Sequence, residues 1–154
     1  MSNIKLNIDP SSIPGFTLWQ VSKLWQRHLT NAVKPFGIGS TEFVLLGNVV
    51  RITQLGKQAT QILLTEATKV DRMTASQILR SLEKKGLIRR VGASEDKRTF
   101  HVTPTKKGVK IADDALGEVI RAHATFFAPL DNNMPDFLQS MNKLIERGKD
   151  EKVT

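Results

Sequence analysis

In the middle of the chain the spacing of apolar side chains changes from a helical period to a strand period, and this change restricts the possible folds most. Four apolar residues at i, i+3, i+4 and i+7 predict a helix over 72–85 with one face toward a core: Ala75, Ile78, Leu79 and Leu82. Asp71 is suited to cap this helix and Gly86 to end it in a left-handed conformation. The runs 87–91 and 99–103 are rich in β-branched residues and flank a polar segment, which predicts a β-hairpin with a long tip.

The remaining sequence predicts further helices. One begins at Pro14 and ends near residue 33, a second runs from an N-cap at Ser40 to Gly56, and a third is capped by Thr60. Pro104 ends the hairpin, a long helix begins at Thr105 or Lys106, and a last helix covers 134–147. The apolar positions expected to pack are Ile62, Leu63 and Ala67 in the third helix, Val109, Ala112, Leu116, Val119 or Ile120, His123 and Phe126 in the long helix, and Phe137, Met141, Leu144 and Ile145 in the last. Four helices, a hairpin and two helices predict a single, mainly α domain over 1–154 with a small β-hairpin.

The net charge of +8 is confined to one segment. From Arg72 to Lys110 the chain has eleven lysines and arginines and three acidic residues, and this difference equals the net charge of the whole chain. A cationic field on one segment is typical of a surface that binds a polyanion, whereas scattered lysines usually form a solvated face.

Two short helices joined by a turn, the second leading into a basic hairpin, form a winged helix-turn-helix. The outward positions of the second helix are Arg72, Met73, Ser76, Gln77 and Arg80, with Thr74 and Ser81 at the margins. Most of these side chains can bond bases or phosphates in the major groove, although an ordinary amphipathic surface helix has the same pattern. The hairpin tip adds Lys97 and Arg98 beside Asp96, which either reach a narrow minor groove or form a charged loop.

Three blocks of this sequence, in chain order, match motifs of a known family. They are the run 71–90, the triplet Asp96-Lys97-Arg98 and the run Thr105-Lys106-Lys107-Gly108. They resemble the recognition helix and first wing strand, the Asp-x-Arg wing motif and the Thr-x-x-Gly start of the dimerisation helix in the MarR (multiple-antibiotic-resistance regulator) family. The strong match covers about residues 60–108. Two residues depart from the family pattern, because Gln77 stands where Arg is frequent and Pro104 where Leu is common.

The resemblance implies a homodimeric, sequence-specific regulator of transcription that binds a palindromic double-stranded operator, more often as a repressor released by a ligand. It implies dimerisation helices at 14–35 and 105–148 around a winged helix-turn-helix lobe at 40–103. The DNA contacts it implies are Arg72, Thr74, Ser76, Gln77, Arg80, Lys97 and Arg98, with Asp96 supporting the wing.

Neither a catalytic centre nor a metal or cofactor site is expected. The chain has no cysteine, and its histidines, His28, His101 and His123, lie on separate predicted elements without ligand spacing. Trp19 and Trp25 on the first helix could wall a pocket for a small aromatic or anionic effector, or they could pack in the core or a dimer interface.

Two other functions compete with DNA-binding regulation. A winged-helix module could contact protein or RNA without binding an operator, but the polar set Ser76, Gln77 and Arg80 favours a duplex. An enzyme would need a nucleophile or metal site that the sequence does not offer. No apolar run reaches the length of about 20 residues that a membrane span needs, and the absence of cysteine suits a reducing compartment, so we expect a cytoplasmic protein without a membrane partner.

Overall fold

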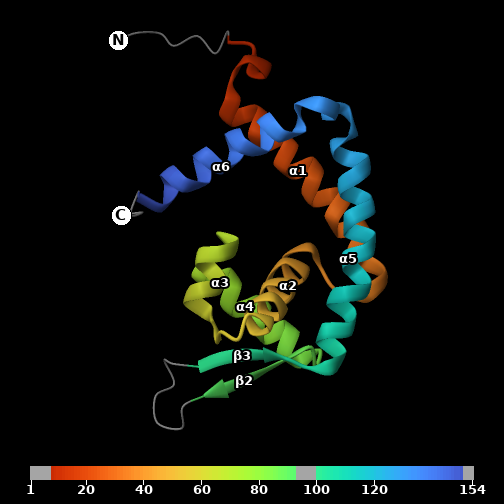
Figure 1. Cartoon of the computed structure of the whole chain (residues 1–154), viewed down its shortest axis with the longest axis vertical. Coiled ribbons are helices and arrows are strands. Elements are labelled where there is room, and N and C mark those ends of the chain that lie inside the picture. Colours follow the sequence, from red (N-terminus) through yellow and green to blue (C-terminus); the bar gives the residue numbers. More distant parts are fainter. Residues whose placement is uncertain (1–7, 93–99, 151–154) are drawn as a thin grey trace.

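The computed structural model describes residues 8–92 and 100–150 and is mainly helical, with one small antiparallel sheet (Figure 1). The expected wing-tip residues Asp96, Lys97 and Arg98 lie outside the described residues. The helical elements are η1 (Pro10–Ser12), α1 (Pro14–Val33), η2 (Lys34–Phe36), α2 (Ser40–Gln54), α3 (Gln61–Thr68), α4 (Arg72–Lys84), α5 (Lys106–Phe127), η3 (Ala128–Asn133) and α6 (Met134–Asp150). The strands are β1 (Ala59–Thr60), β2 (Ile88–Gly92) and β3 (Phe100–Pro104). The predicted winged helix-turn-helix architecture is confirmed.

Side chains cap α3 and α4, the two helices of the helix-turn-helix. Asp71 accepts from the Thr74 N–H at 2.9 Å and Thr60 accepts from the Leu63 N–H at 3.2 Å, as the sequence predicted. The prediction for α2 was wrong: Ser40 is its first helical residue, and Gly39 occupies the N-cap. Glu42 explains the difference, because its carboxylate at the third helical position accepts from the Gly39 N–H at 2.8 Å.

The three strands form an antiparallel sheet in the order β1-β3-β2. Arg90 of β2 faces Val102 of β3, which in turn faces Ala59 of β1 on its other side. The hairpin is confirmed, with each strand one residue further along the chain than predicted. The two-residue β1 had no detectable period in the sequence, because it is too short and directly precedes the Thr60 cap.

The core lies between the lobe helices, the sheet, the end of α1 and the part of α5 up to Val119. Its largest fully buried side chains include Leu45, Leu46, Leu64, Leu79, Leu82, Leu87 and Ile88. For α3 the predicted inner face was wrong: Leu64 is buried, whereas Ile62 (60% exposed), Leu63 and Ala67 are exposed.

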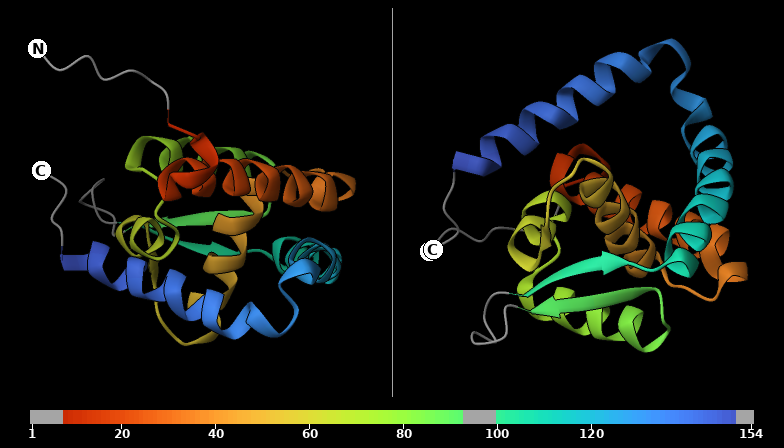
Figure 2. Two further views of the ribbon diagram at one scale, coloured as in Figure 1. Left: turned by 90° about the horizontal axis from the view of Figure 1, so that it is seen from above. Right: turned by 60° about the horizontal axis from the view of Figure 1, so that its bottom comes forward.

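Two outer helices bury less apolar surface than the sequence predicted. On α5 the core positions are Ala112, Ala115 and Val119, while Leu116 remains 46% exposed. On α6 Leu144 and Ile145 are exposed instead of buried. Within the described chain this helix packs mainly against η3, and its Phe137 ring lies 6.4 Å from that of Phe127 on α5. Figure 2 shows α6 extending as an arm from the end of α5 that lies away from the lobe.

An aromatic cluster joins α1 to the far half of α5. The Trp25 ring centroid lies 4.3 Å from that of His123, 5.4 Å from that of Phe126 and 5.6 Å from that of Phe127. Trp25 therefore packs between helices, whereas Trp19 is 61% exposed.

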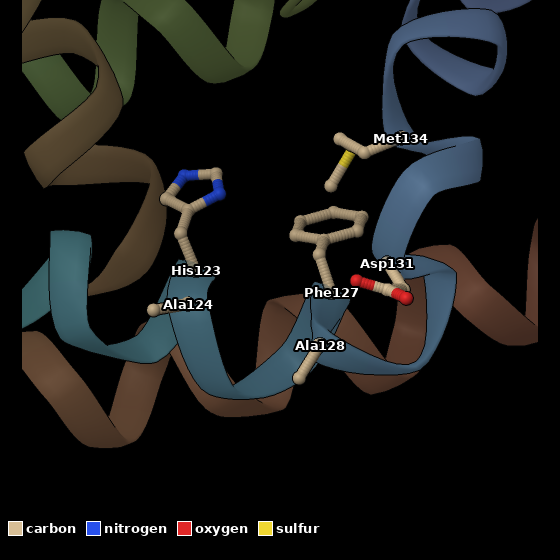
Figure 3. A pocket seen from close by; sticks show the side chains of 6 residues that line it. All are labelled: His123, Ala124, Phe127, Ala128, Asp131 and Met134. Atoms are coloured by element: carbon tan, nitrogen blue, oxygen red, sulfur yellow. The ribbon is translucent and has the colours of Figure 1, made fainter.

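A surface hollow of about 390 Å³ lies beside this cluster. Its walls are His123, Ala124, Phe127, Ala128, Asp131 and Met134, from α5, η3 and α6, and neither tryptophan is among them (Figure 3).

Candidate nucleic-acid interface

The exposed face of α4 is defined by its helical period. Successive residues are rotated by about 100°, so positions i, i+4, i+7 and i+11 lie in one line along a helix. Met73, Gln77, Arg80 and Lys84 occupy these positions and are all exposed. On the opposite side Ala75, Leu79 and Leu82 are fully buried and fix the rotation of the helix. The lobe therefore holds a rigid helix with a polar and cationic face turned outward.

The structure separates the predicted α4 contact residues into two groups. Arg72, Gln77 and Arg80 are exposed, whereas Thr74 and Ser76 are half-buried at the margins. Thr74 also serves the helix cap, because its side chain and backbone N–H donate to Asp71 and lower the pKa of that carboxyl. Lys84 completes the outward line and was not among the contacts expected from the sequence.

The first helix of the helix-turn-helix holds the start of the second. Gln61 at the beginning of α3 donates from Nε2 to the Arg72 carbonyl oxygen at 3.0 Å. Between the helices Lys69 adopts the left-handed conformation with φ 59°, which makes the connection short. The outward face of α4 therefore starts at a fixed place relative to α3.

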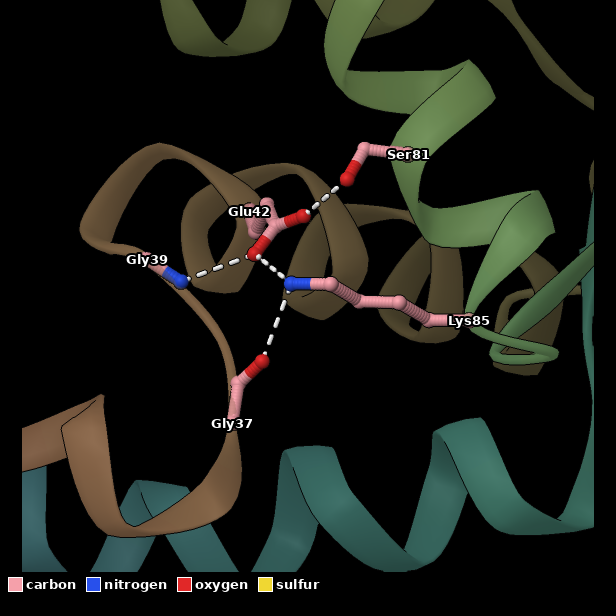
Figure 4. Close-up of polar contacts among 5 residues, drawn as sticks. All are labelled: Gly37, Gly39, Glu42, Ser81 and Lys85. Atoms are coloured by element: carbon pink, nitrogen blue, oxygen red, sulfur yellow. Dashed lines mark hydrogen bonds and ion pairs between the residues drawn. The ribbon is translucent and has the colours of Figure 1, made fainter.

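A buried carboxylate fixes the other end of α4. Glu42 of α2 accepts from the Ser81 hydroxyl at 2.6 Å and from Lys85 Nζ at 2.7 Å (Figure 4). Lys85 Nζ also donates to the Gly37 carbonyl oxygen at 2.9 Å, in the linker between η2 and α2. We call Glu42, Ser81 and Lys85 the carboxylate clamp. It ties the C-terminal end of α4 both to α2 and to the segment that arrives from α1.

The clamp keeps its carboxylate charged. Burial acts to raise the pKa of Glu42, but hydrogen bonds from Lys85, Ser81 and the Gly39 N–H, with the charge of Lys85, outweigh it and lower the pKa. The sequence did not point to the clamp, since the partners of Glu42 on α4 are about forty positions away.

The hairpin continues the cationic surface. Arg90 contacts other residues of the chain. Its Nε lies 2.9 Å from Oε2 of Glu83, and its guanidinium lies 4.8 Å from the centre of the Phe100 ring. Arg89 is exposed, and with Lys106 and Lys107 it lines a surface hollow of about 850 Å³ between β2, β3 and the start of α5. The base of the wing thus contributes cations that belong to the basic segment of the sequence but were not named among the individual DNA contacts.

Within 8–92 and 100–150 no three His, Cys, Asp or Glu side chains are grouped so that they could hold a metal ion. No helix in the described part of the chain has the length and hydropathy to cross a membrane.

Comparisons with known proteins agree with this geometry. The sequence model of the MarR family matches residues 36–99, which include α2, α3, α4 and β2. The HTH-type transcriptional regulator YdcH of Bacillus subtilis is 32% identical over 137 residues, which are 89% of this chain and 92% of that protein.

Solved structures share the fold. A mutant of Escherichia coli MarR in complex with operator DNA superposes with a TM-score of 0.71 at 22% identity, over 85% of this chain and 91% of that one. CouR of Rhodococcus jostii bound to p-coumaroyl-CoA gives a TM-score of 0.70 at 23% identity, over 86% and 94% of the two chains. With a matched sequence model, a 32% identical relative and a shared fold, this chain belongs to the MarR family of DNA-binding transcriptional regulators.

Proposed function

We propose that this regulator is a cytoplasmic homodimer that binds a palindromic operator and represses transcription until a small aromatic or anionic ligand releases it. The outward face of α4 carries the proposal, because Gln77 and Arg80 are exposed side by side on a helix that the core and the clamp hold rigidly. Gln pairs well with adenine and Arg with guanine in the major groove. Affinity comes from the phosphates, which the basic segment from Arg72 to Lys110 attracts.

The proposed contacts of α4 follow from this placement, and those of the wing follow from the resemblance to the MarR family. Gln77 and Arg80 read base edges, and the half-buried Thr74 and Ser76 bond phosphates or bases at the margins of the face together with Arg72. In the wing, Lys97 and Arg98 enter the adjacent minor groove while Asp96 orients Arg98. Two such lobes related by a two-fold axis require half-sites about one helical turn apart.

The dimer is supported by the apolar surface that the single chain leaves exposed. Leu138, Leu144 and Ile145 line one side of α6, and Leu116 and Ile120 do so on α5. A patch of this kind on helices that extend away from the lobe marks an interaction site. We propose that a second copy covers it through α1, α5 and α6, so that the interface is isologous.

The ligand part of the proposal rests on CouR, which shares the fold and was solved with p-coumaroyl-CoA, an aromatic and anionic molecule. In this chain the hollow beside the aromatic cluster offers the rings of His123 and Phe127. It also adjoins the junction of α5 with α6, where a bound molecule would change the angle between the two helices. A ligand there would alter the spacing of the two lobes and hence the fit to both half-sites.

The test is selection of duplex DNA from a random library by the full chain, followed by affinity measurements on the selected duplex. Arg80→Ala is expected to weaken binding at least tenfold, since loss of a base contact costs about 1–3 kcal/mol. Arg121→Ala is the matched control, because Arg121 is a 76% exposed arginine on α5 that pairs with Glu118. Failure to enrich any duplex, or equal affinities of the two variants, would refute the proposed DNA interface.

Repression needs its own measurement. Transcription from a promoter that carries the selected duplex is expected to fall when the protein is added and to recover with an aromatic carboxylate. A rise in transcription on adding the protein would show an activator and leave the DNA interface intact.

A further inference from the structure

Met73 is the apolar member of the outward face of α4. It lies in the line with Gln77, Arg80 and Lys84, and it is 74% exposed. A single exposed apolar side chain on a protein surface needs no explanation in general. The position of Met73 is what makes it informative, since it lies on the outward line of α4, one turn before Gln77.

The N-terminal residues of a recognition helix are those that approach the base edges most closely. Met73 is the second residue of α4, whereas Lys84 is the last, so the apolar side chain stands at the reading end of the helix. The major groove offers one apolar feature to such a side chain, the C5-methyl group of thymine. A methionine side chain is unbranched and flexible, and it adapts to small apolar features.

We propose that Met73 reads a thymine by packing its thioether chain against the C5-methyl group in each operator half-site. This inference rests on the proposed function, because it requires α4 to lie in the major groove. Four residues of helix advance about 6 Å, and neighbouring base pairs are about 3.4 Å apart. The thymine therefore lies within about two base pairs of the position that Gln77 reads.

The competing occupant of this surface is another protein, because exposed apolar side chains also anchor protein contacts. The neighbours of Met73 favour DNA. Arg72 and Arg80 on the same helix are exposed cations, which suit a phosphate-rich partner better than an apolar one.

The experiment replaces thymine by deoxyuridine, one position at a time, in the duplex that the full chain selects. This change removes the methyl group and keeps the base pair, so it isolates the proposed contact. At one thymine in each half-site the wild-type protein is expected to lose about fourfold in affinity per substituted half-site, the value of one buried methyl group. Met73→Ala should bind the thymine and deoxyuridine duplexes equally at that position, whereas Met73→Leu should retain part of the difference.

Leu55→Ala is the control, since Leu55 is an exposed apolar residue at the end of α2 and not on the face of α4. It should keep the full deoxyuridine effect. Three results overturn the inference: selected half-sites without thymine, wild-type binding that no single deoxyuridine weakens, or a methyl effect of equal size in Met73→Ala. Each of these leaves the proposed function standing, because a duplex was selected; if no duplex is selected, the proposed function itself fails.

Discussion

At the scale of single residues, Glu42 shows how the lobe orients its outward face. Its buried carboxylate on α2 receives hydrogen bonds from Ser81 and Lys85 at the end of α4 and from the Gly39 N–H in the linker, so it joins three different segments. A buried charge is costly unless donors surround it, so the three segments must stay together for the carboxylate to remain satisfied. The position of the recognition helix relative to α2 is thereby coupled to an ionised group.

Glu42→Gln tests this coupling. The amide removes the charge and presents an NH₂ group to donors, so we expect the free energy of unfolding to fall by about 1.5–3 kcal/mol at neutral pH. Glu66→Gln on the exposed side of α3 is the matched control and should change it by less than about 0.5 kcal/mol. Denaturant unfolding of both variants measures the difference, and equal stabilities would contradict the role of the clamp.

The stability difference between wild type and Glu42→Gln should also depend on pH. Folding lowers the pKa of Glu42 below its ordinary value of 4.5, so its stabilising contribution is fully present above that pH. The contribution is lost as the pH falls through the lower pKa of the folded state. We therefore expect a constant stability difference between wild type and Glu42→Gln near neutral pH and a shrinking one below about pH 4. A difference that grows on acidification would contradict the assignment.

At the scale of elements, the junction between β2 and α5 depends on one glycine. Thr105 accepts from the Gly108 N–H at 3.0 Å and donates from its hydroxyl to the Gly86 carbonyl oxygen at 2.7 Å. This pins the first turn of α5 against the chain before β2, and a Cβ on Gly108 would lie 1.9 Å from the Leu87 carbonyl oxygen. The Thr-x-x-Gly run is therefore a packing requirement as well as a helix start.

Gly108→Ala should consequently destabilise the fold. The added methyl group meets backbone rather than a movable side chain. We therefore expect the free energy of unfolding to fall by about 1–3 kcal/mol. Gly47→Ala in α2 is the matched control, since no atom lies within 4 Å of its added Cβ and helical propensity favours alanine. The prediction fails if Gly108→Ala is as stable as Gly47→Ala.

The elements also show where sequence reasoning succeeds. For α4 the prediction was accurate because both ends carry end-specific residues, Asp71 and Gly86, and the buried residues are separated by polar ones. For α3 it was wrong because Ile62, Leu63 and Leu64 are consecutive, so no period selects the inner one in an eight-residue helix. The spacing of residues along the chain predicts which side of a helix is buried only where polar residues separate the apolar ones.

Contacts between elements that lie far apart along the chain could not be predicted from the sequence, for a different reason. Ala115 is buried and the larger Leu116 is exposed, because the side of α5 that carries Ala115 packs against the rest of the chain, in which α5 contacts α1 and α2. The clamp likewise joins Glu42 to α4 across about forty residues, and no local pattern encodes such a pairing. The outward face of α4 needed only local information, which is why the candidate interface was largely predictable while the groups that orient it were not.

At the scale of the whole molecule, the single chain leaves apolar side chains exposed on its outer helices. The lobe has a closed core, but α6 presents Leu138, Leu144 and Ile145 without cover from the rest of the described chain. Apolar residues in this pattern on a helix are normally buried, and a second copy can bury them symmetrically. Two lobes in one particle would also bind two half-sites at once, which raises the affinity above that of a single lobe.

Leu144→Glu tests whether this arm forms the dimer. Leu144 is 65% exposed in the single chain, so the substitution leaves the fold of the chain intact but places a charge where the partner would pack. We expect wild type to sediment as a dimer at micromolar concentration and Leu144→Glu as a monomer whose affinity for the two-half-site duplex falls at least a hundredfold. Gln139→Glu adds the same charge on the polar side of α6 and should remain a dimer with unchanged affinity. If Leu144→Glu stays dimeric, the interface lies elsewhere, and if wild type is itself a monomer, the bivalent model of operator binding is wrong.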